Sequence, residues 1–151
     1  MTKAAFDLVI VGVGGQGTLL ASKILGRLAL KENCGVKVSE VHGMSQRGGS
    51  VITHVRVGDR VHSPIVSLGC ADYLLSFEAL EAARAAAFLK PNGVAIVNTQ
   101  RILPMPVITG SCAYPQDPLG DLQNIRIETA DALAIAVESG SQKAINLVLL
   151  G

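Results

Sequence analysis

Apolar runs and a helical repeat of apolar residues alternate over the first 41 positions. Residues 6–11 form an apolar run that ends at glycine, which is typical of a strand buried on both faces of a sheet. Residues 18–31 carry apolar residues at helical spacing, which predicts a helix with one buried stripe. That stripe consists of Leu20, Ile24 and Leu28, with Ala21 alongside. Residues 36–41 alternate as a second strand does, so the chain opens with strand, Gly-rich turn, helix and strand.

The rest of the chain continues this alternation. β-branched residues at 51–57 predict a strand, and Gly58 and Asp59 turn it toward residues 60–63 in an antiparallel hairpin. A proline-rich stretch at 103–119 shows no clear periodicity, so an irregular excursion is expected there. Further strands are expected at 71–77, 94–98 and 124–128, and further helices at 78–89, 131–138 and 141–150.

Strands that alternate with helices predict an α/β fold. We expect a Rossmann-like three-layer domain with a mostly parallel sheet plus an antiparallel hairpin. The length of 151 residues suits one domain, so residues 1–151 are expected to form it. The apolar end at residues 147–150 indicates either that the chain is truncated there or that this end packs on something else.

Composition narrows the class of protein. Hydrophobic residues make up 49% and charged residues 17% of the chain, whereas charged residues are about 25% of an ordinary soluble domain. This excludes disorder and suits a large partner interface, so the isolated chain is expected to form a homo-oligomer. The net charge of +1 gives no support to nucleic-acid or membrane binding.

Charge is unevenly divided between the two parts of the chain. Residues 1–60 carry eight Lys and Arg against four Asp and Glu, whereas residues 61–151 carry five against eight. The basic excess therefore lies with the Gly-rich loops, where it would suit an anionic ligand. A chance scatter of solvated charges explains the same numbers equally well.

The three cysteines, Cys34, Cys70 and Cys112, match no disulfide, zinc or iron–sulfur spacing. Their number and spacing favour a reducing compartment. The sequence also shows no signal peptide and no apolar run of about 18 residues. We therefore expect a cytoplasmic protein.

A first Gly-rich loop follows the first strand. Its Gly12-x-Gly14-x-x-Gly17 pattern lies between strand and helix, where the dinucleotide fingerprint belongs. Backbone N–H groups at the helix start can hold phosphate there, and Glu40 falls where a ribose-binding acid would lie. The alternative is that the glycines only make a close strand–helix turn. The candidate ligand-binding residues are Gly12, Gly14, Gly15, Gln16, Gly17 and Thr18.

A second Gly-rich loop, residues 42–50, follows the second strand and should share the same edge of the sheet. Arg47 could clamp a phosphate or a carboxylate there, or pair with a carboxylate across a partner interface. The candidate ligand-binding residues of this loop are His42, Gln46, Arg47, Gly48 and Gly49.

A self-contained catalytic set is not evident in the sequence. The three histidines lack metal-ligand spacing, and His54 is interpreted as a packed strand residue. No serine lies in a nucleophile-elbow pattern, and no cysteine has a neighbouring base. We therefore assign no catalytic and no metal-binding residue.

Several of these stretches together resemble the gamma-type subunit of 2-oxoacid:ferredoxin oxidoreductases, the pyruvate/ketoisovalerate ferredoxin oxidoreductase gamma family. They are GVGGQGTLLASKILG (12–26), SEVHGMSQRGGSVITHVR (39–56), the Ser63-Pro64 pair and ADYLLSFE (71–78). The similarity continues through Asn98, Pro104 and Gly110. HGMSQRGGSV is most similar to the small (beta) subunit of indolepyruvate ferredoxin oxidoreductases.

The resemblance implies a non-catalytic subunit of a complex that oxidatively decarboxylates a 2-oxoacid, of indolepyruvate or arylpyruvate type, to acyl-coenzyme A. Electrons would pass to ferredoxin, and thiamine diphosphate and iron–sulfur clusters would lie on a large catalytic partner subunit. This chain would bind no cofactor tightly, and coenzyme A would approach its Gly-rich loops. Family members usually extend some tens of residues further, which fits the apolar chain end.

Two alternatives remain open at this point. One is a stand-alone NAD- or nucleotide-binding Rossmann-like protein with Glu40 on the ribose. The other is a nucleotide-sensing or scaffold module without a redox partner.

Overall fold

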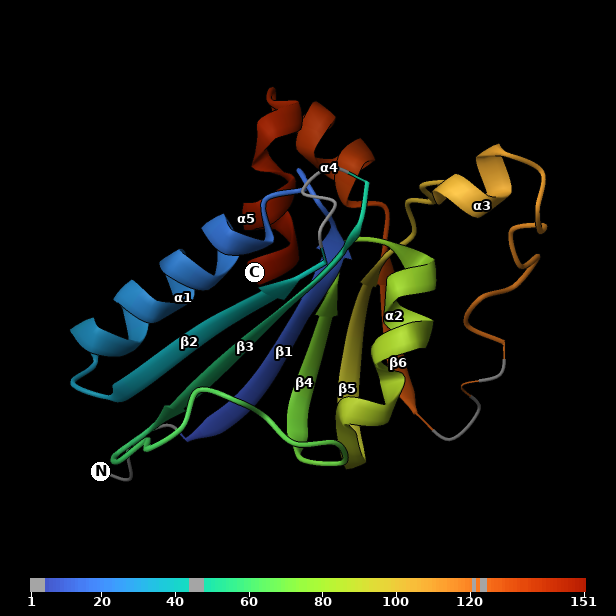
Figure 1. Cartoon of the computed structure of the whole chain (residues 1–151). Helices are drawn as coiled ribbons and strands as arrows, with labels where there is room; N and C mark the ends of the chain where they lie inside the picture. Colours follow the sequence, from blue (N-terminus) through green and yellow to red (C-terminus); the bar gives the residue numbers. More distant parts are fainter. Residues whose placement is uncertain (1–4, 44–47, 121, 123–124) are drawn as a thin grey trace.

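The computed structural model describes all residues except 1–4, 44–47, 121 and 123–124. It contains one six-stranded sheet with helices on both faces (Figure 1). The elements are β1 (Phe6–Val13), α1 (Thr18–Lys31), β2 (Gly35–His42), β3 (Ser50–Gly58), β4 (Ala71–Ser76), α2 (Ala79–Ala85), β5 (Leu89–Asn98), α3 (Met105–Ile108), β6 (Arg126–Ala130), α4 (Ala132–Glu138) and α5 (Ile145–Leu150). Short 3-10 helices, Ala86–Phe88 and Gln142–Ala144, follow α2 and precede α5.

The strand order is β2-β3-β1-β4-β5-β6. β1, β4, β5 and β6 run parallel, whereas β3 is antiparallel to both β1 and β2. The expected α/β fold, with a mostly parallel sheet and an antiparallel hairpin, is therefore confirmed. The hairpin is formed by β2 and β3 and not by residues 51–63.

The core lies in two layers on either side of β1, because successive side chains of a strand point to opposite faces. Leu8 and Ile10 pack with residues of α1, α4 and α5. Val9 and Val11 pack on the opposite face with Ala82 and others of α2. The apolar run at residues 6–11 thus reflects a central strand covered on both faces.

The predicted buried stripe of α1 is wrong at Leu20 and Leu28, although Ala21 is buried as expected. Leu20 and Leu28 are 51% and 54% exposed, and the helix instead buries small residues: Thr18, Ala21, Ser22, Gly26 and Ala29. Small residues allow the helix axis to lie close to the sheet, and the rotation that turns them inward turns the leucines toward solvent. The helix bounds, by contrast, match the prediction.

The predicted hairpin between 51–57 and 60–63 is also wrong, since residues 60–63 form no strand. Both edges of β3 are already occupied, by β1 and by β2, so no backbone groups are left on which a further strand could pair. Residues 60–63 run instead in the loop that leads to Val66, which is buried against His54 of β3.

The described part of residues 99–125 forms an excursion from the sheet between β5 and β6, and Figure 1 shows its helix α3 standing away from the body of the domain. The expectation of irregular structure is confirmed, apart from the four-residue helix α3. Among the described residues, no helix is long and apolar enough to cross a membrane.

Candidate functional site

The carboxyl ends of β1, β4 and β5 meet at one pocket of about 400 Å³. Open α/β sheets bind ligands at this edge, because the loops after parallel strands converge there. The first Gly-rich loop forms one wall, and the segment that leads into α5 forms the opposite wall. The lining residues are Gly15, Gln16, Gly17, Leu20, Phe77, Gln100, Gln142, Lys143, Ile145 and Asn146.

Gln16 holds the first loop in place. Its Oε1 accepts a hydrogen bond of 2.7 Å from the N–H of Val13, and its Nε2 donates to the carbonyl of Phe77 and to Oε1 of Gln100. Gly12 lies beneath this side chain, where an added Cβ would come within 2.9 Å of Oε1 of Gln16. Gln16 therefore both caps the loop and lines the pocket.

Gly17 forms the start of α1 in a left-handed conformation, with φ of 88°. Its carbonyl accepts from the N–H groups of Leu20 and Ala21, and it has no side chain to cap the helix. A Cβ at this position would lie 2.5 Å from Nδ2 of Asn146, so only glycine allows α5 to approach so closely. The first N–H groups of α1 therefore have no side-chain cap, and the residues just before them, 15–17, line the pocket.

The pocket's electrostatic character is set by the helix start and by one cation. The N-terminus of the 14-residue α1 carries a partial positive charge, and Lys143 is the cation among the described residues that line the pocket. Neither Lys143 nor Asn146 is evident from a local motif, because both lie more than 120 residues after the first loop.

The two Gly-rich loops do share one edge of the sheet. The N–H of Gly14 donates a 2.9 Å hydrogen bond to the carbonyl of Gly49. Gly48, with φ of 76°, is exposed beside it. Gln46 and Arg47 lie outside the described residues, so their predicted roles stay predictions.

His42 and Glu40 do not reach the first Gly-rich loop. His42 pairs with Val51, and Val51 pairs with Gly12, so one whole strand lies between them. Glu40 Oε2 accepts a hydrogen bond of 3.3 Å from Thr53 on that intervening strand. A ribose-binding acid has to lie on the strand beside β1, where this fold places antiparallel β3. The geometry therefore does not favour the NAD alternative.

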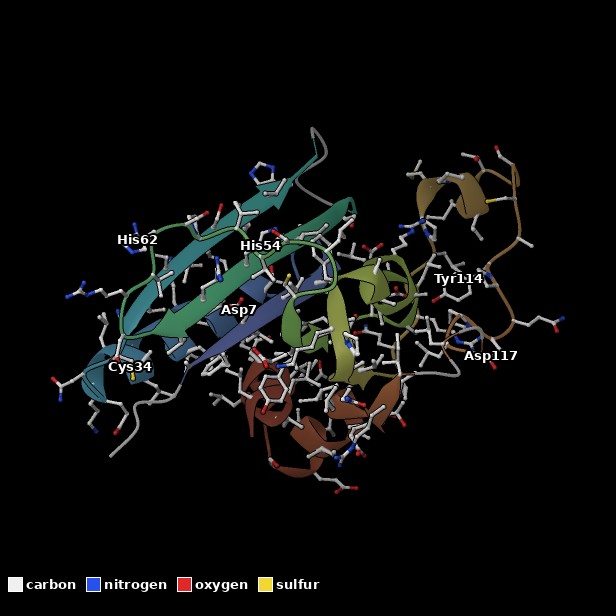
Figure 2. The ribbon with its side chains drawn as sticks, turned by 90° about the horizontal axis from the view of Figure 1, so that it is seen from below. Asp7, Cys34, His54, His62, Tyr114 and Asp117 are labelled. Carbon is white, nitrogen blue, oxygen red and sulfur yellow. The ribbon has the colours of Figure 1, made fainter. Side chains whose placement is uncertain are left out.

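His54 is buried in the layer beneath the 59–70 loop (Figure 2). Its Nδ1 accepts a 3.3 Å hydrogen bond from the N–H of Val66, and its ring lies edge-on to Phe88. Burial lowers the pKa of this imidazole below its usual value. The interpretation of His54 as a packed strand residue is confirmed.

Glu78 is a buried carboxylate, 1% exposed, that the sequence analysis did not single out. Its Oε2 caps α2 by accepting from the N–H of Glu81, and its Oε1 accepts from the N–H of Ile102 and the hydroxyl of Tyr114. Burial, together with this hydrogen bond and the nearby carboxylate charge, raises the pKa of Tyr114 well above its usual value. Glu78 thus fastens the excursion to the start of α2.

No group of three or more His, Cys, Asp or Glu able to hold a metal occurs among the residues that the structure describes. Cys34 is buried, whereas Cys70 and Cys112 are exposed thiols. The pocket at the carboxyl ends of β1, β4 and β5 is suited to an anionic ligand, because the uncapped start of α1 offers backbone N–H groups and Lys143 offers a positive charge.

Comparison with known proteins gives three kinds of match. The family model described as pyruvate ferredoxin/flavodoxin oxidoreductase matches residues 7–151. The indolepyruvate oxidoreductase subunits IorB of Archaeoglobus fulgidus and Pyrococcus horikoshii are 42% and 44% identical, over 96% and 97% of this chain and 74% and 75% of theirs.

Solved structures share the fold. The gamma subunit of a keto/oxoacid ferredoxin oxidoreductase from Geobacter sulfurreducens aligns with a TM-score of 0.67 at 22% identity, over 96% of this chain and 73% of its own. A 2-oxoglutarate:ferredoxin oxidoreductase from Magnetococcus marinus, solved with coenzyme A bound, aligns with a TM-score of 0.61 at 14% identity. The alignment covers 96% of this chain but 23% of the Magnetococcus chain, so the same fold there forms part of a much longer chain.

Proposed function

The chain belongs to the pyruvate ferredoxin/flavodoxin oxidoreductase family. On that premise we propose that the pocket beside its first Gly-rich loop holds the phosphate-bearing part of coenzyme A. It is a subunit of a 2-oxoacid oxidoreductase, as its relatives are. Complexes of this family use thiamine diphosphate and iron–sulfur clusters. The similarity to IorB supports indolepyruvate or a related aryl 2-oxoacid as the substrate.

In this proposal residues 1–151 form one gamma-type domain, and the chemistry takes place on larger partner subunits in the cytoplasm. The 2-oxoacid loses its carboxylate as CO₂, its acyl group forms a thioester with coenzyme A, the thiol proton is released and two electrons pass to ferredoxin. Thiamine diphosphate on the partner supplies the carbanion chemistry of the decarboxylation. This chain contributes binding and orientation, and by itself it is inactive.

The residues of the pocket support the coenzyme A proposal because they can bind a phosphate group. The uncapped N-terminus of α1 offers N–H donors, Gly15 leaves the approach open, and Lys143 supplies a positive charge. The volume of about 400 Å³ accommodates part of such a ligand. Leu20 and Ile145 line the same pocket and offer apolar contacts.

The test is the Michaelis constant for coenzyme A in the assembled complex. A charge-assisted hydrogen bond is worth about 1.5–3 kcal/mol, so Lys143→Ala should raise this constant about tenfold to a hundredfold. The turnover number should stay near wild type, because Lys143 binds the ligand and does not react. Lys37→Ala, at an exposed lysine of β2, is the matched control. An unchanged constant for Lys143→Ala with normal assembly would overturn the proposal.

A further inference from the structure

The outward face of α1 exposes an unusual amount of apolar surface. Leu19, Leu28 and Leu30 are 41%, 54% and 62% exposed. Figure 1 shows α1 along the β2 side of the sheet, with no labelled helix or strand on its far side. Exposed apolar groups gathered on one helix face indicate an interaction surface.

The same face carries a row of positive charge. Lys23, Arg27 and Lys31 follow one another at intervals of four residues, are all exposed, and lie between the leucines. The helix contains no acidic residue. Like charges four residues apart repel one another and weaken a helix, and α1 has no carboxylate to offset this repulsion.

The repulsion among these three cations is thus not offset by any acidic residue within α1. Local features that conflict with the stability of the fold are expected at functional surfaces. We propose that the outward face of α1, around Arg27, is the docking surface for an acidic and apolar face of the larger partner subunit. This inference rests on the family membership, but not on the coenzyme A pocket.

A symmetric contact between two copies of this chain does not suit the surface. A twofold contact places the same patch on both subunits. Lys23, Arg27 and Lys31 of one copy would then face the same three cations of the other. An acidic partner removes this repulsion and offsets the cationic row, while the leucines pack on its apolar side chains.

Charge reversal at the centre of the row tests the proposal. Arg27→Glu should leave the fold intact, because the new carboxylate can pair with Lys23 and Lys31 at four-residue spacing. Its binding to the purified large subunit of the same complex should weaken about tenfold or more, and wild-type affinity should fall as salt rises. Lys37→Glu is the matched control. Lys37 is exposed on β2 and lies opposite Arg56 in the strand register, on the face of the sheet that α1 does not cover. Equal binding of wild type and Arg27→Glu would overturn the proposal.

Leu30→Gln gives an independent test without a change of charge. The polar side chain should leave the melting temperature of the isolated chain near wild type, because Leu30 is 62% exposed and glutamine favours helix about as well as leucine. It should also reduce binding to the large subunit. If either variant instead dissociates oligomers of the isolated chain while binding the large subunit normally, the surface serves a second copy and the proposal is wrong. Both variants should leave the Michaelis constant for coenzyme A unchanged in any complex that forms, which separates this test from the test of Lys143.

Discussion

Nε2 of Gln16 donates a 3.0 Å hydrogen bond to the backbone carbonyl of Phe77, although 61 residues separate the two in the chain. The same amide accepts from the N–H of Val13 through Oε1. One side chain therefore joins the loop after β1 to the end of β4. The wall of the pocket is set by this contact before any ligand binds.

Replacement of Gln16 by Glu should destabilise the chain by about 1–3 kcal/mol, because the carboxylate cannot donate to the Phe77 carbonyl and repels it. Urea unfolding of the full chain measures this change. Gln100→Glu is the matched control. Oε1 of Gln100 only accepts hydrogen bonds, from Gln16 and Asn98, and a carboxylate preserves both. Equal losses for the two variants would contradict the assigned role of Gln16.

Gly17→Ala should cost more stability than Gly15→Ala. Both glycines have positive φ, 88° and 101°, so each substitution carries backbone strain of order 1–3 kcal/mol. Only at Gly17 would the new Cβ also meet Asn146, whereas the space around Gly15 is open. The difference between the two unfolding free energies therefore reports the contact between α5 and the first loop, and Gly17→Ala with Asn146→Ala should recover part of it.

Stability should fall at acidic pH in a way that depends on His54. Burial lowers the pKa of His54, so the folded chain resists protonation more than the unfolded chain does, whose histidine titrates near 6.5. The contribution of neutral His54 is fully present above pH 6.5 and is lost as the pH falls toward the lower folded pKa. Urea unfolding at pH 7.5 and pH 5 should show a larger acid loss for wild type than for His54→Gln. An equal loss in both proteins would contradict the prediction.

Arg47→Ala in the assembled enzyme should raise the Michaelis constant for coenzyme A about tenfold to a hundredfold, if its guanidinium clamps the phosphate as the sequence predicts. Size-exclusion chromatography of the complex checks assembly in the same preparation. An unchanged constant with normal assembly would remove Arg47 from the ligand site. Failure to assemble would support the alternative in which Arg47 pairs with a partner carboxylate.

Local patterns in the sequence were sufficient to place most elements. The start of α4 is one example, since Asp131 caps the helix through the N–H of Ala134 as its position predicts. The buried run at residues 6–11 was enough to identify a central strand, because a strand covered on both faces needs apolar residues throughout. Resemblance in the Gly-rich motifs was enough to indicate the family, which the comparisons confirm.

Other features depended on contacts that no local pattern encodes. Periodicity marked α1 as a helix, but the sheet decided that its small residues face inward and its leucines outward.

By itself, therefore, the sequence determined most of the strands and helices, where the two Gly-rich loops lie and to which family the chain belongs, because these depend on local spacing and motif. Only the tertiary structure decided that β3 lies between β1 and β2, which separates Glu40 from the first loop. It alone brought Lys143 and Asn146 to Gly17. Strand order and the meeting of distant segments follow from how whole surfaces pack and which strand edges remain open, and neither is written in the neighbours of any one residue.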